Sequence, residues 1–156
     1  MLQGFNRHRL GVAVFVATLC AASSAFAAGF GPRVGVTGDP DQVHLGLHFD
    51  AVRMAPSLGF MPSFEVGVGN DVTLFSVNFD FKYAFDARAA AWRPYAGAGP
   101  ALHFVNIDNG ADNTEVGFAF FGGMQTGTRS GAFFTEIRLG VVDSPDFKFT
   151  VGWLFR

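Results

Sequence analysis

The chain has little cysteine and little charge, and it has no long apolar run after its N-terminal segment. Of its 156 residues one is cysteine, and charged residues make up 15%. The lone cysteine, Cys20, excludes an internal disulfide and a cysteine-based metal site. No basic cluster indicates nucleic-acid binding. No apolar run beyond residue 28 approaches the roughly 20 residues that a membrane-spanning helix needs.

What the chain does contain is apolar and small. It has 20 Phe and 20 Gly, and hydrophobic residues make up 49% of the sequence. High hydrophobicity without a spanning helix leaves two fold classes, a domain with a large buried core or a membrane β-barrel.

The N-terminus has the features of an export signal. A basic stretch at 7–9 precedes an apolar stretch at 10–19, and Ala-Phe-Ala at 25–27 fits the small-x-small cleavage rule. We therefore expect residues 1–27 to be a cleaved signal peptide and residues 28–156 to form one domain. A retained membrane anchor is the alternative. Cys20 lies within this segment, so we expect it to be removed with the signal peptide.

The last residues alternate with a period of two, which is the side-chain period of a β-strand. Leu154 is the one exception to a polar or small second face, which is otherwise Lys148, Thr150 and Gly152. The apolar face consists of Phe149, Val151, Trp153 and Phe155.

The same alternation recurs along the whole chain. It predicts strands within 32–36, 43–51, 60–69, 73–85, 92–104, 115–121, 133–140 and 147–155. Several exceed the roughly 5–6 residues of ordinary strands and suit the about 9–11 of strands tilted across a bilayer. The apolar faces carry no charge, so we expect them to face lipid. The fold predicted is all-β, a single eight-stranded antiparallel up-and-down transmembrane barrel with short loops. A soluble lipocalin-like barrel, with its apolar face inward, is the alternative.

Three prolines fall on the apolar faces, at Pro62, Pro94 and Pro100. Because proline cannot donate to a ladder, we expect each near a strand end or a bulge.

The polar faces carry charges of both signs, which should pair in a narrow interior because unpaired buried charges are costly. We expect an ion-pair network that plugs the lumen; a gated pore whose pairs exchange partners is the alternative. With Arg33, the residues of this network are Asp50, Glu65, Asp80, Lys82, Arg93, Glu115, Glu136, Arg138 and Lys148.

The connections differ in charge on the two sides. With both termini periplasmic, the outer turns are short and acidic, and the inner ones carry Arg53, Asp86 with Arg88, and Arg129. The outer aspartates suit ordinary turns. A calcium site is the sharper hypothesis, since carboxylates from neighbouring loops offer oxygen ligands. Its ligands would be Asp39, Asp41, Asp143 and Asp146.

Two stretches resemble a known family. Arg-Pro-Tyr-Ala-Gly-Ala-Gly-Pro at 93–100 resembles the RPYxGxG strand of small outer-membrane β-barrel domains, the OmpA-like and porin-family barrels. Residues 147–155 resemble their C-terminal assembly strand. The resemblance implies recognition by the barrel assembly machinery through Phe149, Val151, Trp153 and Phe155. Arg156, after the terminal aromatic, departs from the pattern. We expect no appended periplasmic domain and therefore no peptidoglycan anchoring of the OmpA type.

The histidines of the predicted domain are His44, His48 and His103. His44 and His48 lie roughly 13 Å apart along a strand, too far to chelate one metal. We expect carboxylates to hold these side chains in the lumen. No serine and histidine stand in a deacylase-type pattern, so we expect no catalytic residues, and no cofactor.

The predicted role is structural or interaction-based within the bacterial outer membrane. Narrow-pore transport of small solutes or ions is the second hypothesis, and a lipid A-modifying enzyme the third. The expected partners are outer-membrane lipid, lipopolysaccharide and the assembly machinery; the sequence does not predict an oligomeric state.

Overall fold

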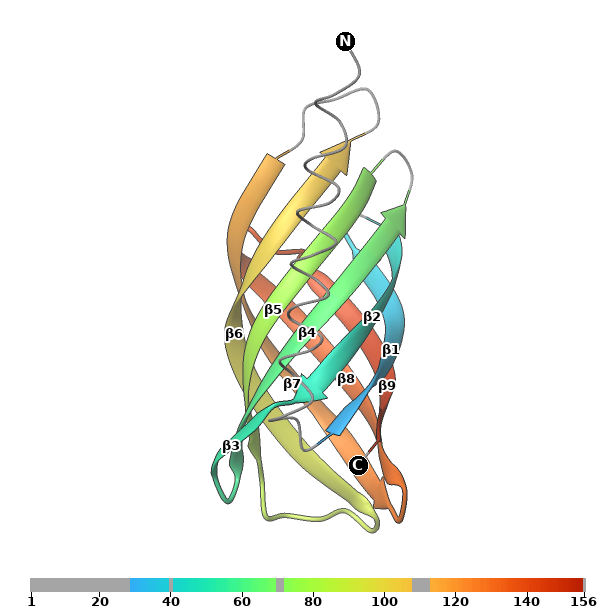
Figure 1. Cartoon of the computed structure of the whole chain (residues 1–156), viewed down its shortest axis with the longest axis vertical. Coiled ribbons are helices and arrows are strands. Elements are labelled where there is room, and N and C mark those ends of the chain that lie inside the picture. Colours follow the sequence, from blue (N-terminus) through green and yellow to red (C-terminus); the bar gives the residue numbers. More distant parts are fainter. Residues whose placement is uncertain (1–28, 40, 70–71, 108–112, 156) are drawn as a thin grey trace, which may run out of the picture.

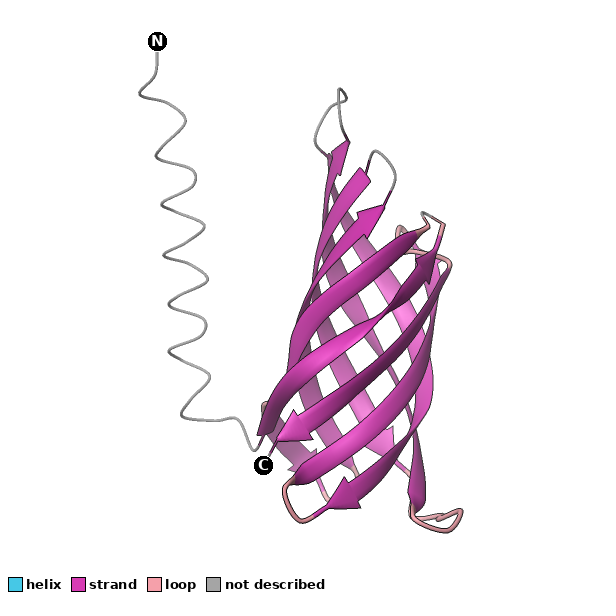
Figure 2. Cartoon of the chain, turned by 90° about the vertical axis from the view of Figure 1, so that its right-hand side faces the viewer, coloured by secondary structure: helices cyan, strands magenta, loops and turns pink. Residues whose placement is uncertain are grey.

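The computed structural model describes residues 29–39, 41–69, 72–107 and 113–155. The predicted signal peptide, residues 1–27, and Arg156 lie outside these ranges. Regular structure in the described ranges is β-strand (Figure 2). The strands are β1 (Gly29–Gly38), β2 (Gln42–Asp50), β3 (Val52–Ala55), β4 (Leu58–Gly69), β5 (Val72–Ala84), β6 (Trp92–Ile107), β7 (Asn113–Thr128), β8 (Gly131–Val142) and β9 (Phe147–Phe155).

The strands form one antiparallel sheet that closes on itself. Its order is β2-β1-β9-β8-β7-β6-β5-β4-β3, and β2 also pairs with β4. β2 and β3 follow one another along β4, with an irregularity at Ala51, whose N–H donates to the carbonyl of Phe60 at 3.1 Å. They therefore act as one strand. The predicted fold class, an eight-stranded antiparallel barrel, is confirmed (Figure 1).

Several strands are longer than the sequence pattern predicts. β7 has 16 residues, whereas alternation marks only 115–121. Its second half contains Gly122, Gly123, Gln125 and Thr126, which are too small or too polar to show alternation. Cross-strand pairing with β6 and β8 nevertheless continues through them, because backbone groups pair regardless of side chain.

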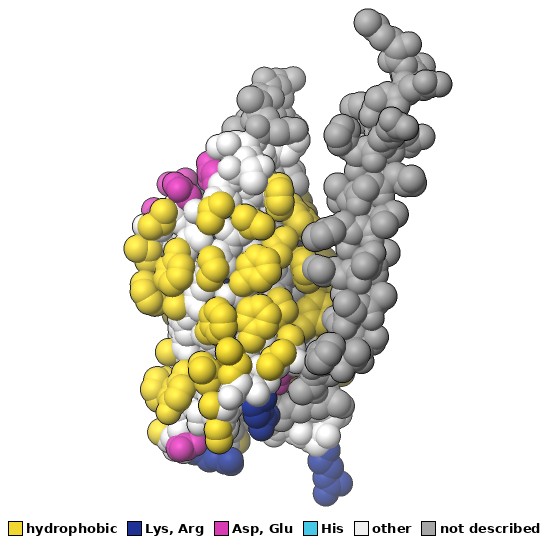
Figure 3. Space-filling view, turned by 60° about the vertical axis from the view of Figure 1, so that its left-hand side comes forward, with side chains coloured by type: hydrophobic (Ala, Val, Ile, Leu, Met, Phe, Trp, Pro, Cys, Tyr) yellow, Lys and Arg dark blue, Asp and Glu magenta, His cyan; other side chains and the backbone are white. Residues whose placement is uncertain are grey.

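Side chains alternate between the lumen and the outer surface, and the outer surface is apolar. Leu45 is 64% exposed and Val116 is 65% exposed, although both are large hydrophobic residues. Figure 3 shows such side chains forming a broad apolar area across the face of the barrel in view, with charged groups near its two ends. No helix in the described part of the chain is long and apolar enough to cross a membrane.

Leu154, the apparent exception in the last strand, keeps the alternation. It is 3% exposed and lies on the inner side with Ala132, which is also 3% exposed. A second apolar group inside the barrel consists of Ala84, Tyr95, Phe121 and Phe134. The inner face is therefore not only polar and small, as the sequence suggested, but contains an aromatic layer as well.

Two of the prolines lie opposite interruptions in pairing, and the third lies near the start of a strand. Pro62 lies opposite the break between β2 and β3, where 49–51 face only two residues of β4 between the pairs His48–Ser63 and Val52–Phe60. Pro100 lies opposite a stretch of β5 with no ladder pair, and Pro94 is the third residue of β6. Their missing N–H groups thus cost little pairing.

β1 begins and β9 ends at the same end of the barrel, which we call the terminal end (Figure 1). The connections at this end cover 56–57, 85–91 and 129–130. We call the opposite end the far end; its connections cover 39–41, 70–71, 108–112 and 143–146.

Candidate functional site in the barrel lumen

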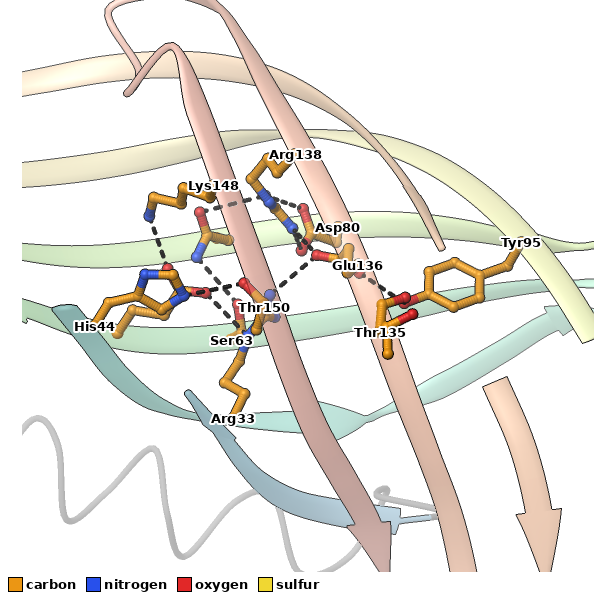
Figure 4. Close-up of polar contacts among 12 residues, drawn as sticks. Arg33, His44, Ser63, Asp80, Tyr95, Thr135, Glu136, Arg138, Lys148 and Thr150 are labelled. Atoms are coloured by element: carbon orange, nitrogen blue, oxygen red, sulfur yellow. Dashed lines mark hydrogen bonds and ion pairs between the residues drawn. The ribbon is translucent and has the colours of Figure 1, made fainter. Parts of the chain in front are cut away.

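Two arginines and three carboxylates meet inside the barrel. Arg33 on β1 places Nε 3.0 Å from Oε1 of Glu65 on β4 and Nη2 3.0 Å from Oε1 of Glu136 on β8. All three side chains are about 1% exposed, so Arg33 links opposite walls within a water-poor space (Figure 4).

Arg138 makes a second centre beside the first. Its Nη1 donates to Oδ1 of Asp80 at 3.0 Å, and its Nη2 donates to Oδ2 of the same carboxylate. This is the bidentate arrangement that a planar guanidinium favours. Nη2 also lies 3.3 Å from Oε1 of Glu136. Glu136 therefore bridges Arg138 and Arg33.

Lys148 on β9 completes the charge balance. Its Nζ donates to Oε2 of Glu65 at 2.8 Å. Buried charges are stable only when paired and hydrogen-bonded. The lumen network, as we call it, contains equal numbers of cations and carboxylates: Arg33, Arg138 and Lys148 with Glu65, Asp80 and Glu136.

Glycines beside the network make room for these long side chains. A Cβ on Gly46 would lie 2.2 Å from the carbonyl oxygen of Phe64 and 2.9 Å from Cγ of Glu65. A Cβ on Gly97 would lie 2.3 Å from Cζ of Phe121. An eight-stranded barrel has a narrow interior, so large residues must alternate with small ones.

The aromatic layer contacts the network. Tyr95 donates its hydroxyl to Oε2 of Glu136 at 3.1 Å. The guanidinium of Arg138 lies 4.8 Å from the ring centre of Phe121, and that of Arg33 lies 5.9 Å from the ring centre of Phe134. These distances suit cation–π attraction.

Hydroxyl groups, not carboxylates, hold His44 and His103, so the expectation of carboxylate partners was wrong for these two histidines. His44 bonds Thr37 through Nδ1 at 2.9 Å and Thr150 through Nε2 at 3.0 Å. His48 lies edge-on to the ring of Phe134, with centroids 4.9 Å apart.

His103 forms a chain that the sequence did not predict. Its Nδ1 bonds the Ser76 hydroxyl at 2.9 Å, and its Nε2 bonds the Ser144 hydroxyl at 3.1 Å. Ser144 belongs to the connection 143–146, so this chain ties the far end to the inner wall. The group at Nδ1 is a hydroxyl, not the carboxylate of a Ser-His-Asp triad. The contact joins residues 41 apart in sequence, which no local pattern shows.

Four of the predicted network residues lie outside it. Arg93 pairs with the exposed Asp86 at 3.0 Å and donates to the carbonyls of Phe85 and Ala84. Lys82 donates to Gln125 and lies 5.1 Å from the ring centre of Tyr95.

Asp50 and Glu115 form no ion pair with a described residue. Asp50 ends β2 at the terminal end, and Glu115, near the start of β7, accepts from Asn113 at 2.8 Å. The position near a strand end explains both, because charged groups there reach solvent. The lumen network thus spans the middle of the barrel only.

The four aspartates of the calcium hypothesis are all exposed. Within the described ranges, no group of three or more His, Cys, Asp or Glu side chains could hold a metal ion. Asp39 and Asp143 have positive φ values of 44° and 37°, a conformation that aspartate tolerates in turns. The geometry therefore favours the turn interpretation.

A cavity of about 380 Å³ opens at the far end. Acidic and apolar side chains line it, together with the Ser144–His103 pair. Its lining includes Asp39, Glu115, Asp143 and Asp146 beside Val72, Leu74, Val105 and Pro145.

Comparison with solved structures identifies the architecture. The crystal structure of Neisserial surface protein A (NspA) matches with a TM-score of 0.63 and 15% identity, covering 81% of this chain and 92% of NspA. The N-terminal β-barrel domain of Pseudomonas aeruginosa OprF matches with a TM-score of 0.59 and 16% identity, again covering 81% and 92%. The fold is that of the small outer-membrane β-barrels. No family model and no curated protein matches the sequence.

The resemblance that the sequence suggested thus holds at the level of the barrel fold. Residues 93–100 form the first half of the long strand β6, and 147–155 form β9, which joins β1 to β8. Phe149, Val151, Trp153 and Phe155 lie on its outer side, and Phe149 and Phe155 are 40% and 46% exposed.

Proposed function

We propose that this chain is an outer-membrane barrel of the bacterial envelope, with a structural or interaction role and a lumen plugged by side chains. The observation that carries the proposal is the inversion of polarity. The outer surface carries large exposed hydrophobic residues, whereas the inside holds Arg33, Glu65 and Glu136 at 1–2% exposure. A soluble barrel would have the reverse arrangement.

A plug is supported by two layers across the lumen. The lumen network spans opposite walls, and the aromatic layer of Tyr95, Phe121 and Phe134 lies against it. Eight strands leave an interior that side chains can fill. We therefore infer that the barrel conducts no solute in this state.

Delivery to the membrane is part of the proposal. Residues 1–27 would direct export and be cleaved, and the outer face of β9, ending in Trp153 and Phe155, would be recognised by the barrel assembly machinery. Outer-membrane lipid and lipopolysaccharide would then cover the apolar outer surface.

The decisive experiment is fractionation of cells expressing the full chain, with electrophoresis of heated and unheated samples. We expect the protein in the outer-membrane fraction, with faster mobility unheated than heated and a mass that corresponds to loss of residues 1–27. A soluble protein with one mobility would refute the proposal. Retention of the full mass in the membrane would instead support an uncleaved anchor.

A narrow pore is the second candidate, and one contact favours it. Oε1 of Glu136 lies 3.0 Å from Nη2 of Arg33 and 3.3 Å from Nη2 of Arg138. A small displacement of the Glu136 carboxylate would therefore exchange one arginine partner for the other. Planar-bilayer recordings separate the two roles. Discrete current steps that change in Glu136→Gln would support the pore, and their absence at all voltages supports the plug.

A further inference from the structure

The charges at the two ends of the barrel differ in sign. The far end carries Asp39, Asp41, Glu115, Asp143 and Asp146, and no Lys or Arg lies among its described connections. The terminal end carries Arg53, Arg88, Arg93 and Arg129, with Asp50 and Asp86. Figure 3 shows Lys and Arg gathered at the lower, terminal end, and Asp and Glu mainly at the upper end.

Three of these arginines have no carboxylate partner among the described residues, and all three are exposed: Arg53, Arg88 and Arg129. Arg93 differs, because Asp86 and two backbone carbonyls occupy its guanidinium. Exposed, unpaired guanidinium groups are suited to bidentate contact with an anionic oxygen group from outside the protein.

The three arginines are distributed around the rim rather than clustered. Arg53 lies in β3 beside the connection 56–57, Arg88 in the connection 85–91, and Arg129 in the connection 129–130. These are the three described connections at the terminal end. A partner that binds one small patch would not use all three, whereas a surface surrounding the barrel would.

The arginine rim also borders the apolar outer surface. Val52 and Met54, on either side of Arg53, are 46% and 58% exposed. Tyr83 and Phe85, which lead into the connection containing Arg88, are 48% and 42% exposed. Aromatic and cationic side chains next to a hydrophobic band occupy the headgroup region of a bilayer.

We propose that this arginine rim binds the phosphate groups of anionic phospholipids in the leaflet at the terminal end. The inference rests on the proposed function, since it requires the barrel to span a bilayer. The acidic far end lacks the charge to bind the same lipids, so the rim would also favour one orientation of the barrel. A surface of anionic lipid attracts each nearby arginine strongly enough for about a fivefold change in association.

The tryptophans of the chain can serve as fluorescent probes of lipid binding at the terminal end. The chain has two, Trp92 at the start of β6 and Trp153 near the end of β9, and both lie at the terminal end. Both are partly exposed. Bromine on lipid chains quenches tryptophan fluorescence at short range. The protein, purified from membranes after full-chain expression, would be reconstituted in vesicles of dioleoylphosphatidylcholine and dioleoylphosphatidylglycerol, with either lipid brominated.

We expect brominated phosphatidylglycerol to quench several-fold more strongly, per lipid, than brominated phosphatidylcholine. The preference should fall by up to about fivefold for each arginine removed. It should be lost in R53Q/R88Q/R129Q, and in about 1 M salt, where the Debye length is about 3 Å. The matched control is D39N/D41N/D143N, which changes as many charges at the far end. It should leave quenching at the tryptophans unchanged.

Each outcome separates the two proposals. Equal quenching by both lipids, in protein that shows heat-modifiable mobility, would overturn the arginine rim and leave the membrane barrel intact. A preference that survives R53Q/R88Q/R129Q would also overturn it. No quenching by either lipid would show that the protein is not embedded and would overturn both.

Discussion

Arg138 on β8 and Asp80 on β5 face each other across the lumen and share two parallel hydrogen bonds, one of them from Nη1 to Oδ1 at 3.0 Å. Both side chains are nearly fully buried, at 4% and 1% exposure. Breaking a buried pair costs more than removing it, because the remaining charge has no water to solvate it.

The pair therefore predicts a non-additive result. Asp80→Leu and Arg138→Met should each destabilise the barrel by about 3–5 kcal/mol, whereas the double variant should lie within about 1–2 kcal/mol of the wild type. Urea unfolding in lipid vesicles measures the free energy of unfolding of the wild type, the two single variants and the double variant. Asp86→Asn is the control, because Asp86 itself is exposed and its pair with the half-buried Arg93 should contribute at most about 1 kcal/mol. Additive single effects would show that the pair is not coupled.

Gly46 provides a test of the packing around the network. An added Cβ would meet the Phe64 carbonyl oxygen at 2.2 Å, which is backbone and cannot rotate away. Gly46→Ala should destabilise the barrel by about 1–3 kcal/mol through overpacking. Gly38→Ala is the matched control, since nothing lies within 4 Å of its added Cβ. The fraction of unheated protein that migrates fast on a gel, measured at increasing urea concentration, gives the unfolding midpoint of each variant. Equal midpoints for Gly46→Ala and Gly38→Ala would contradict the packing argument.

The sequence predicts the fold class because alternation is local. Each run from 43–51 to 147–155 reports its own inner and outer face, and a closed barrel is the arrangement that lets every apolar face point outward. The limits of the strands are harder to predict. The second half of β7 pairs on both sides although glycine and polar residues there conceal the period.

The network was predictable as a set of inward charges but not as a set of contacts. Periodicity places Asp50, Arg93 and Glu115 on the same face as Glu65 and Glu136, yet it contains no information on depth. Depth depends on strand register and tilt, which place the first three near the ends. Contacts such as His103 with Ser144 depend on a turn that folds toward the lumen, which alternation does not encode.

If the outer surface faces lipid, as we propose, the free-energy cost of an added charge should depend on its depth in the bilayer. Leu45, midway along β2 and 64% exposed, and Met54, in β3 at the terminal end and 58% exposed, are similarly accessible. In vesicles Leu45→Arg should cost about 2–4 kcal/mol and Met54→Arg about 0–1 kcal/mol. Urea titration of the refolded variants measures the difference. If both changes are neutral, the outer surface does not face lipid.

The last strand predicts a defect that appears only in cells. Phe155 and Phe147 stand at opposite ends of β9 and are 46% and 41% exposed, so alanine at either site removes a similar ring from the outer surface. If the terminal aromatic is read by the assembly machinery, Phe155→Ala should lower the folded protein in the outer membrane several-fold, whereas Phe147→Ala should not. Refolding of the two purified variants into vesicles should give similar urea midpoints, because no machinery takes part. If both variants reduce the folded protein in the outer membrane of cells equally, the terminal position has no special role in assembly. In that case β9 contributes to assembly only through its pairing with β1 and β8.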